Sequence, residues 1–326
     1  MSGTSPFVTD RSWPRRISPV EIVLYGYFGK GNLGDEALLG VWSRVLSDVG
    51  ETVPMAPPRL PRKGTVVFTG EPLQDRTSRR SLFFYAAAIR AAAGRGRAVL
   101  GAVGVDVRSV PGRRLLPKIL RDVDYISVRD PLSLRQLHAV GVTAREARDV
   151  ALLLDPPGGS RRGPVLLNLV PTLPASVRRS ALAFAREAAR RLGKRVKALV
   201  MARKEDERAL RGLDPVLAGS ADEALEAIAD AALVVGARLH SLEFSLLCGT
   251  PFVAVPYAPK VEAFLDLVGR DLPAPVPRIP GARAREALES ILSVRYRVAL
   301  SAARTRLRRE ATEGVTDVVR YLRRVA

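Results

Sequence analysis

The chain has one cysteine, two histidines and no long apolar run, and each scarcity excludes a class of protein. Cys248 has no partner for an intramolecular disulfide, so we expect a reducing compartment. His138 and His240 form no Cys/His cluster, so we expect no metal site. No stretch reaches the roughly 20 apolar residues that cross a bilayer. These features predict a soluble, cytoplasmic protein.

Acidic residues are also few, and the formal net charge is +19. A nucleic-acid-binding surface would concentrate this charge. Only seven lysines occur, however, and the arginines are scattered through every predicted helix. We therefore interpret the excess as compositional bias and expect no nucleic-acid partner. Contact with an anionic acceptor or with the anionic inner face of a membrane remains compatible with the charge.

Short β-rich runs alternate with longer helical patterns, which is typical of parallel sheets with crossover helices. The chain is long for one hydrophobic core, so we expect two domains. The first strands are predicted at 20–25, 65–69, 98–103 and 124–128, and the second series at 165–169, 196–201, 232–235 and 252–256. The helices between them are predicted at 35–49, 81–93, 113–121, 131–140, 175–192, 222–230 and 239–247.

The segment DPPGGSRRGP, residues 155–164, concentrates Pro and Gly and predicts an inter-domain linker. The fold class is therefore α/β: two Rossmann-like, doubly wound domains facing a cleft, in a glycosyltransferase-B-like (GT-B-like) arrangement with a C-terminal helix crossing back. The predicted parts are a disordered tail (1–18), two Rossmann-like domains (19–156 and 163–282) and a helical segment (283–326). Ligands of open α/β sheets bind at the carboxyl ends of the strands, so the cleft should collect the functional residues.

The stretch GYFGKGNLGDEALL, residues 26–39, joins the first strand to a helix. Its glycines permit close backbone approach, but it lacks the Lys-Ser/Thr ending of a P-loop. Asn32, Asp35 and Glu36 are candidate substrate-binding residues of the N-domain wall. The alternative is a flexible turn whose acidic residues stabilise a helix N-terminus.

The segment LVVGARLHS, residues 233–241, predicts an anion site in the second domain. A buried strand ends at Gly236, and Arg238, His240 and Ser241 follow at a helix N-terminus, where free N–H groups and two cationic side chains converge. Lys260, at the start of the next helix, adds a second cation or is simply solvated.

Three further segments carry candidate groups. Asp75, in LQDRTS, precedes a helix and could serve as acid or base. In SVRDPLS, Asp130 and Pro131 suit the N-cap and first helical positions, which leaves Arg129 as the functional group. Asp149 precedes an apolar run near the domain boundary and is expected to face the cleft.

Taken together and in order, GYFGKGNLGDEALL, LQDRTS, SVRDPLS and GARLHSLEFSLLCGTPFVAVPYAPKVEAFL resemble the polysaccharide pyruvyl transferase family, in its CsaB-type bacterial branch. The resemblance runs from about residue 21 to about residue 268. It implies transfer of a pyruvyl group from phosphoenolpyruvate, a co-substrate rather than a cofactor, to a sugar hydroxyl pair. The products are a pyruvate ketal and phosphate. The acceptor implied is a lipid-linked or free glycan, the precursor of a cell-wall polysaccharide that anchors surface-layer proteins.

The resemblance also implies residue roles. Arg238, Leu239 and His240 match the family's phosphoenolpyruvate-binding element, and Arg129 matches its second arginine. Asp75 and Asp149 match acidic positions. A donor with a phosphate and a carboxylate needs cationic groups, and protonation of its methylene needs an acid. We therefore expect Arg129, Arg238 and His240 to bind the donor, and His240 and the two aspartates to be catalytic.

The sequence departs from the family at two places. It reads FTGEPLQD where members carry GGGSLLQD, and GAVGV, residues 101–105, where they carry QGIGP. Both lie on the N-domain side of the predicted cleft. Two alternatives therefore stay open: a degenerate member that binds phosphoenolpyruvate or a glycan without turnover, and a GT-B glycosyltransferase that uses a nucleotide sugar.

Overall fold

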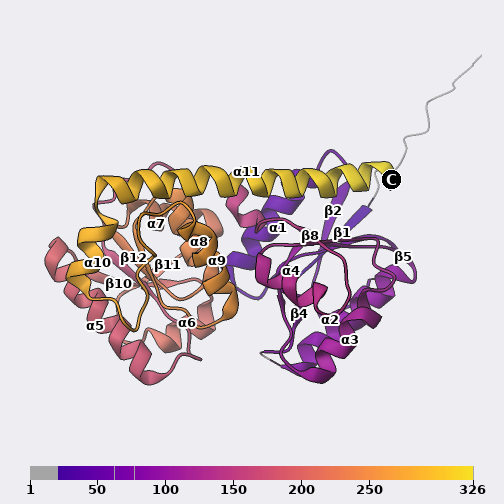
Figure 1. The fold of residues 1–326 in the computed structure, drawn as a ribbon, viewed down its shortest axis with the longest axis horizontal. Helices are drawn as coiled ribbons and strands as arrows, with labels where there is room; N and C mark the ends of the chain where they lie inside the picture. Colours follow the sequence, from indigo (N-terminus) through magenta and orange to yellow (C-terminus); the bar gives the residue numbers. More distant parts are fainter. Residues whose placement is uncertain (1–20, 62, 77, 326) are drawn as a thin grey trace, which may run out of the picture.

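The computed structural model describes residues 21–61, 63–76 and 78–325. The predicted tail, residues 1–18, lies outside the described residues. Two parallel sheets, each flanked by helices, stand side by side, and a long helix runs along one side of both (Figure 1). We call the part around the first sheet the N-lobe and the part around the second the C-lobe. The predicted fold class, with its C-terminal helix crossing back, is confirmed.

The N-lobe sheet has six strands in the order β2-β1-β3-β5-β7-β8. The strands of the N-lobe are β1 (Glu21–Tyr25), β2 (Glu51–Met55), β3 (Gly64–Phe68), β4 (Leu73–Gln74), β5 (Gly96–Val103), β6 (Val105–Asp106), β7 (Tyr125–Val128) and β8 (Arg145–Glu146). Its helices are α1 (Leu33–Leu46), α2 (Arg79–Ala93), α3 (Val110–Leu120), α4 (Pro131–His138) and the 3-10 helix η1 (Val150–Leu153). Strands β4 and β6 pair separately as a two-stranded ribbon.

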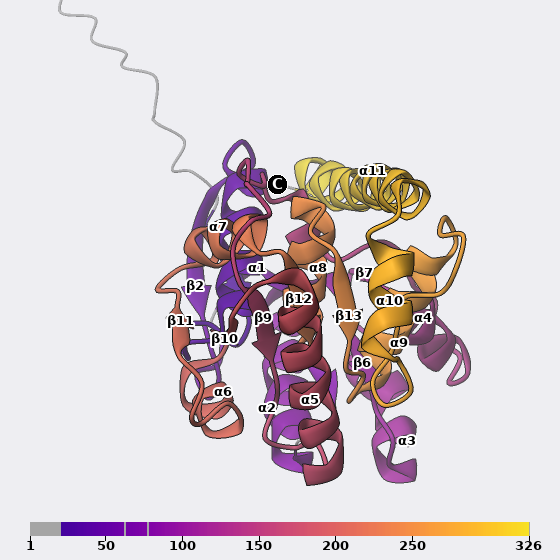
Figure 2. The ribbon, with the colours of Figure 1, turned by 90° about the vertical axis from the view of Figure 1, so that its left-hand side faces the viewer.

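The C-lobe sheet has five strands in the order β11-β10-β9-β12-β13. Its strands are β9 (Val165–Asn168), β10 (Val196–Val200), β11 (Pro215–Leu217), β12 (Leu233–Gly236) and β13 (Phe252–Ala254). Its helices are α5 (Ala175–Leu192), α6 (Arg203–Ala209), α7 (Ala221–Asp230), α8 (Leu239–Cys248), α9 (Pro259–Gly269) and α10 (Ala284–Ile291). The last helix, α11 (Val294–Val325), lies over both lobes, as the turned view also shows (Figure 2).

Along each strand, alternate side chains point to opposite faces of the sheet and pack into different hydrophobic cores. Val23 and Val66 face α2 to α4 on the outer side of the N-lobe, and Val165 faces α5 and α10 on the outer side of the C-lobe. The opposite faces, with Ile22 and Leu166 among them, belong to one continuous cluster that also includes residues of α1, η1, α8 and α11. The lobes are therefore joined by an apolar interface, which favours a fixed relative orientation.

Two differences from the predicted elements have simple causes. The strands β2 and β11 were not predicted because both are sheet edges, and each contains a proline, which edge positions tolerate. The helical segment after residue 283 is two helices rather than one. Ser293 separates them, because its hydroxyl accepts the backbone N–H of Tyr296 and so caps the start of α11.

Within the described residues, no helix is both long enough and apolar enough to cross a membrane.

Candidate active site

Charged side chains from both lobes meet where the strands of the two sheets end. Asp35 follows β1, Glu71 follows β3 and Arg129 follows β7 in the N-lobe. His240 follows β12 and Lys260 follows β13 in the C-lobe. Both sheets reverse their strand order beside these ends, between β1 and β3 and between β9 and β12. Such switch points are where doubly wound folds bind ligands.

Arg129 is the central cation of this cluster, and its side chain is only 4 % exposed. Nη1 lies 3.0 Å from Oδ2 of Asp149 and Nη2 lies 3.4 Å from Oε1 of Glu71. Burial alone would lower the pKa of Arg129, but the carboxylates of Asp149 and Glu71 raise it above its usual range. Gly104 makes room for the guanidinium, because a Cβ there would lie 2.7 Å from Nη2. Arg129 is therefore a fixed, permanently charged group.

Lys260 joins the cluster from the other lobe. Its Nζ lies 2.8 Å from Oε2 of Glu71, so this ion pair links α9 of the C-lobe to the loop after β3. Burial would raise the pKa of Glu71, but Lys260 and Arg129 outweigh it and lower the pKa to about 2. Glu71 is thus ionised and neutralises two cations that come from opposite lobes.

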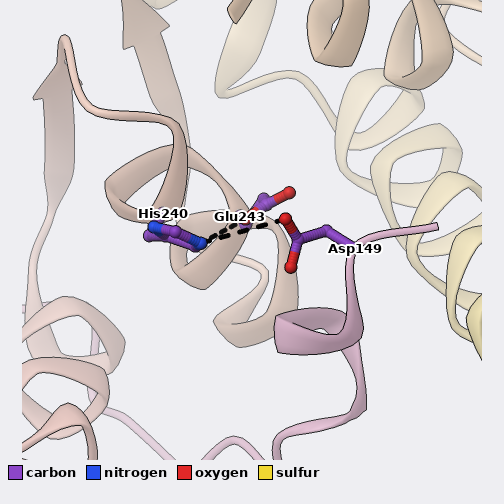
Figure 3. Close-up of side chains that lie close together, drawn as sticks. All are labelled: Asp149, His240 and Glu243. Carbon is purple, nitrogen blue, oxygen red and sulfur yellow. Dashed lines mark ion pairs between the residues drawn. The ribbon is translucent and has the colours of Figure 1, made fainter. Parts of the chain in front are cut away.

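His240 lies at the start of α8 and points toward Asp149 (Figure 3). Its Nε2 is 3.9 Å from Oδ2 of Asp149 and 3.8 Å from Oε2 of Glu243. Burial, together with nearby cations, lowers the pKa of His240 to about 4. The other side of the ring lies against α1: a Cβ on Gly34 would be 1.8 Å from Nδ1. The glycine of the GNLGDE turn therefore lets the N-lobe approach this imidazole.

Two carboxyl groups of the cluster resist ionisation. Burial, the largest cause, raises the pKa of Asp35 to about 7, although Lys260 and Arg129 act in the opposite direction. Burial also raises the pKa of Glu243 well above its usual value, and the charge of Asp149 adds to the effect. The site therefore holds dissociable protons beside fixed cations.

Arg238 is held in a clamp of carboxylates within the C-lobe. Its Nε is 2.8 Å from Oδ1 of Asp206, and Nη2 is 2.7 Å from a carboxylate oxygen of Glu205. Asp206 is fully buried and also accepts the amide of Asn168 and the backbone N–H groups that follow β10. The expectation of a free guanidinium at the helix start is thus corrected, because carboxylates of its own lobe occupy its donors.

Asp75 lies away from the cluster. Its carboxylate accepts the backbone N–H groups of Arg108 and Ser109 and the hydroxyl of Ser109 at the start of α3. Burial alone would raise the pKa of Asp75, but these hydrogen bonds outweigh burial and lower the pKa below its usual value. These bonds let Asp75 hold the start of α3, and its expected role as an acid or base stays a prediction.

The remaining candidates support the backbone around the site. Asn32 caps α1 by accepting the N–H of Gly34, and Glu36 accepts the N–H of Gly29. The same turn touches the other lobe, because Leu33 N–H donates to the carbonyl of Met201 at 2.9 Å. In α8, Leu239 is buried, and the hydroxyl of the buried Ser241 donates to the carbonyl of Arg238.

The family is identified by a direct comparison. A family model described as polysaccharide pyruvyl transferase matches residues 32–259, well over half of the chain. This chain belongs to the polysaccharide pyruvyl transferase family. The matched region holds every member of the charged cluster except Lys260, which follows its last residue. Comparison with curated proteins found no match.

Solved structures similar to this pyruvyl transferase family member share its architecture. A putative UDP-N-acetylglucosamine 2-epimerase from Listeria monocytogenes has a TM-score of 0.59 at 9% identity, covering 93% of this chain and 95% of its own. UDP-N-acetylglucosamine 2-epimerase from Neisseria meningitidis, bound to UDP-GlcNAc, has a TM-score of 0.53 at 11% identity. The match covers 93% of this chain and 99% of that one. A UDP-glucosyltransferase from Polygonum tinctorium has a TM-score of 0.51 at 12% identity. The match covers 93% of this chain and 98% of that one. At these identities the likeness shows the GT-B fold alone.

The structure adds three residues that sequence reasoning missed in this family member: Glu71, Asp206 and Glu243. Glu71 had a signal, since it stands in FTGEPLQD where the family pattern has a serine. Glu243 also had one, as an acidic residue within the apolar run SLEFSLLC. Asp206 had none, because RKEDERA is typical of a solvated helix.

A small cavity borders part of the charged cluster in this pyruvyl transferase family member. The cavity lined by Arg129, Asp149, Glu243 and Lys260 has a volume of about 10 Å³. That is room for roughly one water molecule. A substrate therefore needs side chains to move or the lobes to separate.

Proposed function

We propose that this protein transfers a pyruvyl group from phosphoenolpyruvate to a pair of sugar hydroxyls on a glycan, in the CsaB-type branch of the family. The supporting observation is the meeting of Arg129 and Lys260, from opposite lobes, beside His240 and protonated carboxyl groups. Two fixed cations suit a donor with a phosphate and a carboxylate. The family match covers nearly all of these residues.

The donor replaces Glu71 as the partner of the two cations. In this structure Glu71 forms ion pairs with both Lys260 and Arg129, so the oxygen atoms of the donor compete with this carboxylate for the two cations. Displacing Glu71 breaks its ion pair with Lys260, which links the two lobes. Donor binding is thus coupled to the opening of the cleft.

The reaction forms two C–O bonds at C2 of phosphoenolpyruvate and breaks the C2–O bond to phosphate. The two sugar hydroxyls lose two protons, the methylene carbon gains one, and the phosphate leaves with the other. We assign protonation of the methylene to Asp35, whose raised pKa keeps a proton near neutral pH. Once Asp35 has given up its proton it receives one from a sugar hydroxyl, and the leaving phosphate takes the other. Asp149 and His240 hold the donor in place.

Phosphate release from phosphoenolpyruvate tests the proposal, measured with and without N-acetylmannosamine-containing oligosaccharides, free or lipid-linked. We expect release only when the acceptor is present. Asp35→Asn should abolish it, whereas Asp48→Asn, at an exposed aspartate that follows α1, should not. Binding without release would instead show a non-catalytic member, and dependence on a nucleotide sugar would show a glycosyltransferase.

A surface of the N-lobe suits a lipid-linked acceptor at the cytoplasmic face of a membrane. Helices α2 and α3 pack together and expose Phe83, Phe84 and Val110, which are 61%, 47% and 61% exposed. Neither helix contains an acidic residue, and their exposed arginines are Arg79, Arg80, Arg90, Arg113 and Arg114. Exposed aromatic residues among arginines favour contact with anionic lipids.

This membrane contact is testable with vesicles that contain a fraction of anionic lipid. We expect the protein to sediment with them, and Phe83→Ser/Phe84→Ser to stay in solution while retaining activity on a soluble acceptor. Equal sedimentation of the variant and the wild type would contradict the assignment of this surface.

A further inference from the structure

Three side chains direct ligand atoms toward one point between the lobes. Asp149 comes from the start of η1, and His240 and Glu243 come from the same face of α8 (Figure 3). One oxygen or nitrogen of each lies within 4.8 Å of the other two. Nε2 of His240 is 3.8 Å from Oε2 of Glu243 and 3.9 Å from Oδ2 of Asp149.

Two of these atoms have no hydrogen-bond partner. Nε2 of His240 and Oε2 of Glu243 are both buried and unpaired, and Glu243 as a whole is only 2 % exposed. Nearly all buried polar groups in proteins are paired, and an exception points to a missing water or ion. Leaving a buried polar atom unpaired destabilises the folded state. These two unpaired atoms therefore indicate a missing water molecule or ion between them.

The spacing suits a small divalent cation. Ligand bonds of about 2.0–2.2 Å place neighbouring ligand atoms roughly 3–3.5 Å apart. The observed 3.8 and 3.9 Å are larger by about half an ångström, within the reach of small side-chain rotations. Asp149 is already oriented, since Oδ1 accepts the N–H of Ala151 and Oδ2 accepts Arg129. Such outer contacts commonly hold metal-binding carboxylates in place.

The surrounding charges can accommodate a further cation. Arg129 and Lys260 are the nearest cations, and Arg238, which is paired with Asp206 and Glu205, also acts on His240. Glu71, Asp130 and Asp149 are close carboxylates. Glu243 supplies a fourth when it is ionised. A divalent ion would thus balance the negative charge of the carboxylates that the nearby cations leave uncompensated.

We propose that Asp149, His240 and Glu243 bind one divalent transition-metal ion. An imidazole with two carboxylates suits Zn²⁺ and Mn²⁺ better than Mg²⁺ or Ca²⁺, which prefer oxygen ligands only. Three protein ligands leave at least one coordination position open. That position takes an anionic oxygen of the donor, a second part of the inference that rests on the proposed function.

Metal binding itself is tested without substrate. The full chain, freed of metal with a chelator and dialysed, is titrated with Zn²⁺ or Mn²⁺ by calorimetry, with the spectrum of bound Mn²⁺ as a second readout. We expect one ion per chain. Glu243→Leu, whose neighbours in α8 are apolar, and His240→Asn should each weaken binding at least tenfold. Glu262→Gln, which removes an exposed carboxylate from α9, should leave the affinity unchanged.

The outcomes separate the two parts of the inference. No stoichiometric binding by the wild type would overturn the metal site and leave a shared proton between His240 and Glu243. Equal affinity of wild type and folded variants would overturn the choice of ligands. The second part predicts that the metal tightens phosphoenolpyruvate binding at least tenfold, and an unchanged donor affinity in the metal-bound protein would overturn that part alone.

Discussion

Two strand-to-helix junctions of this molecule each carry an arginine that is wholly or largely shielded from solvent, and the two have different partners. Arg129, after β7, contacts carboxylates of two separate loops, and its charge acts on His240 and Lys260 of the other lobe. Arg238, after β12, contacts Asp206 and Glu205 of its own lobe. One arginine belongs to an inter-lobe site and the other to the internal framework of a lobe.

The difference teaches that the position of an arginine at a strand end does not determine its role. Both junctions look alike in sequence, since each places a basic residue just before a helix. The free donors of a guanidinium depend on which carboxylates the rest of the fold brings to it. Arg238 pairs with the fully buried Asp206, whereas Glu71, a partner of Arg129, also pairs with Lys260 of the other lobe.

The largest effect is expected from Arg129→Met. The variant leaves Asp149 and Glu71 buried with less positive charge, and losing one partner of a buried ion pair costs about 3–5 kcal/mol. The free energy of unfolding, measured by urea denaturation, should fall by that amount, and phosphoenolpyruvate affinity should fall at least tenfold.

Arg145→Met is the matched control for Arg129→Met. Arg145 pairs with Asp317 at the surface, where its side chain is 66% exposed. Exposed pairs contribute about 0–1 kcal/mol, so both stability and donor affinity should stay close to those of the wild type. If the two methionine variants behaved alike, the central place of Arg129 would be refuted.

Gly34→Ala sharpens the contrast by acting on the inter-lobe site without changing any charge. Its Cβ would lie 1.8 Å from Nδ1 of His240, so the imidazole or α1 must move. Overpacking of this kind costs about 1–3 kcal/mol. Because the displaced ring belongs to the site, transfer activity should fall about 100-fold.

Gly40→Ala provides the comparison within the same helix. A Cβ at Gly40 meets nothing within 4 Å, so the variant gains helix propensity of about 1 kcal/mol and keeps its activity. Equal rates for the two alanine variants would show that His240 does not depend on the closeness of α1.

Arg238→Met should have a smaller effect than Arg129→Met. Asp206 keeps its bonds to Asn168 and to two backbone N–H groups, so the loss of stability is about 1–3 kcal/mol. Donor affinity, measured by calorimetry, should change less than tenfold. A complete loss of donor binding in the folded variant would return Arg238 to the donor site that the sequence predicts for it.

Most of the fold was predictable because the central strands of each lobe are buried on both faces. They are therefore continuous apolar runs, such as IVLY and LVVG, and stand out between helical patterns. Edge strands β2 and β11 escape such reasoning, because they are only partly buried and contain proline. The break before α11 depends on one serine cap.

The candidate site was predictable where residue type and position in a motif agree, as for Arg129, His240 and Lys260. Partners that come from elsewhere in the chain were not. Glu71 contacts Lys260 across 189 positions, and the point shared by Asp149 and Glu243 combines two lobes. Local pattern carries no information on such pairs, so the clamp on Arg238 and the metal-type cluster required the structure.

The smallest change in stability is expected at Ala102. This residue lies in β5, which pairs with β7, the strand that precedes Arg129. Ala102 has φ of 51°, a left-handed conformation at the irregularity of β5, and its N–H donates to Ser127. That conformation costs a residue with a Cβ roughly 1–2 kcal/mol. Ala102→Gly removes this cost but adds about 0.5–1 kcal/mol of chain entropy, so the protein should become up to about 1.5 kcal/mol more stable. Ala98→Gly, at a buried position of the same strand without positive φ, should instead lose about 1 kcal/mol, and equal losses in urea denaturation would refute the left-handed turn.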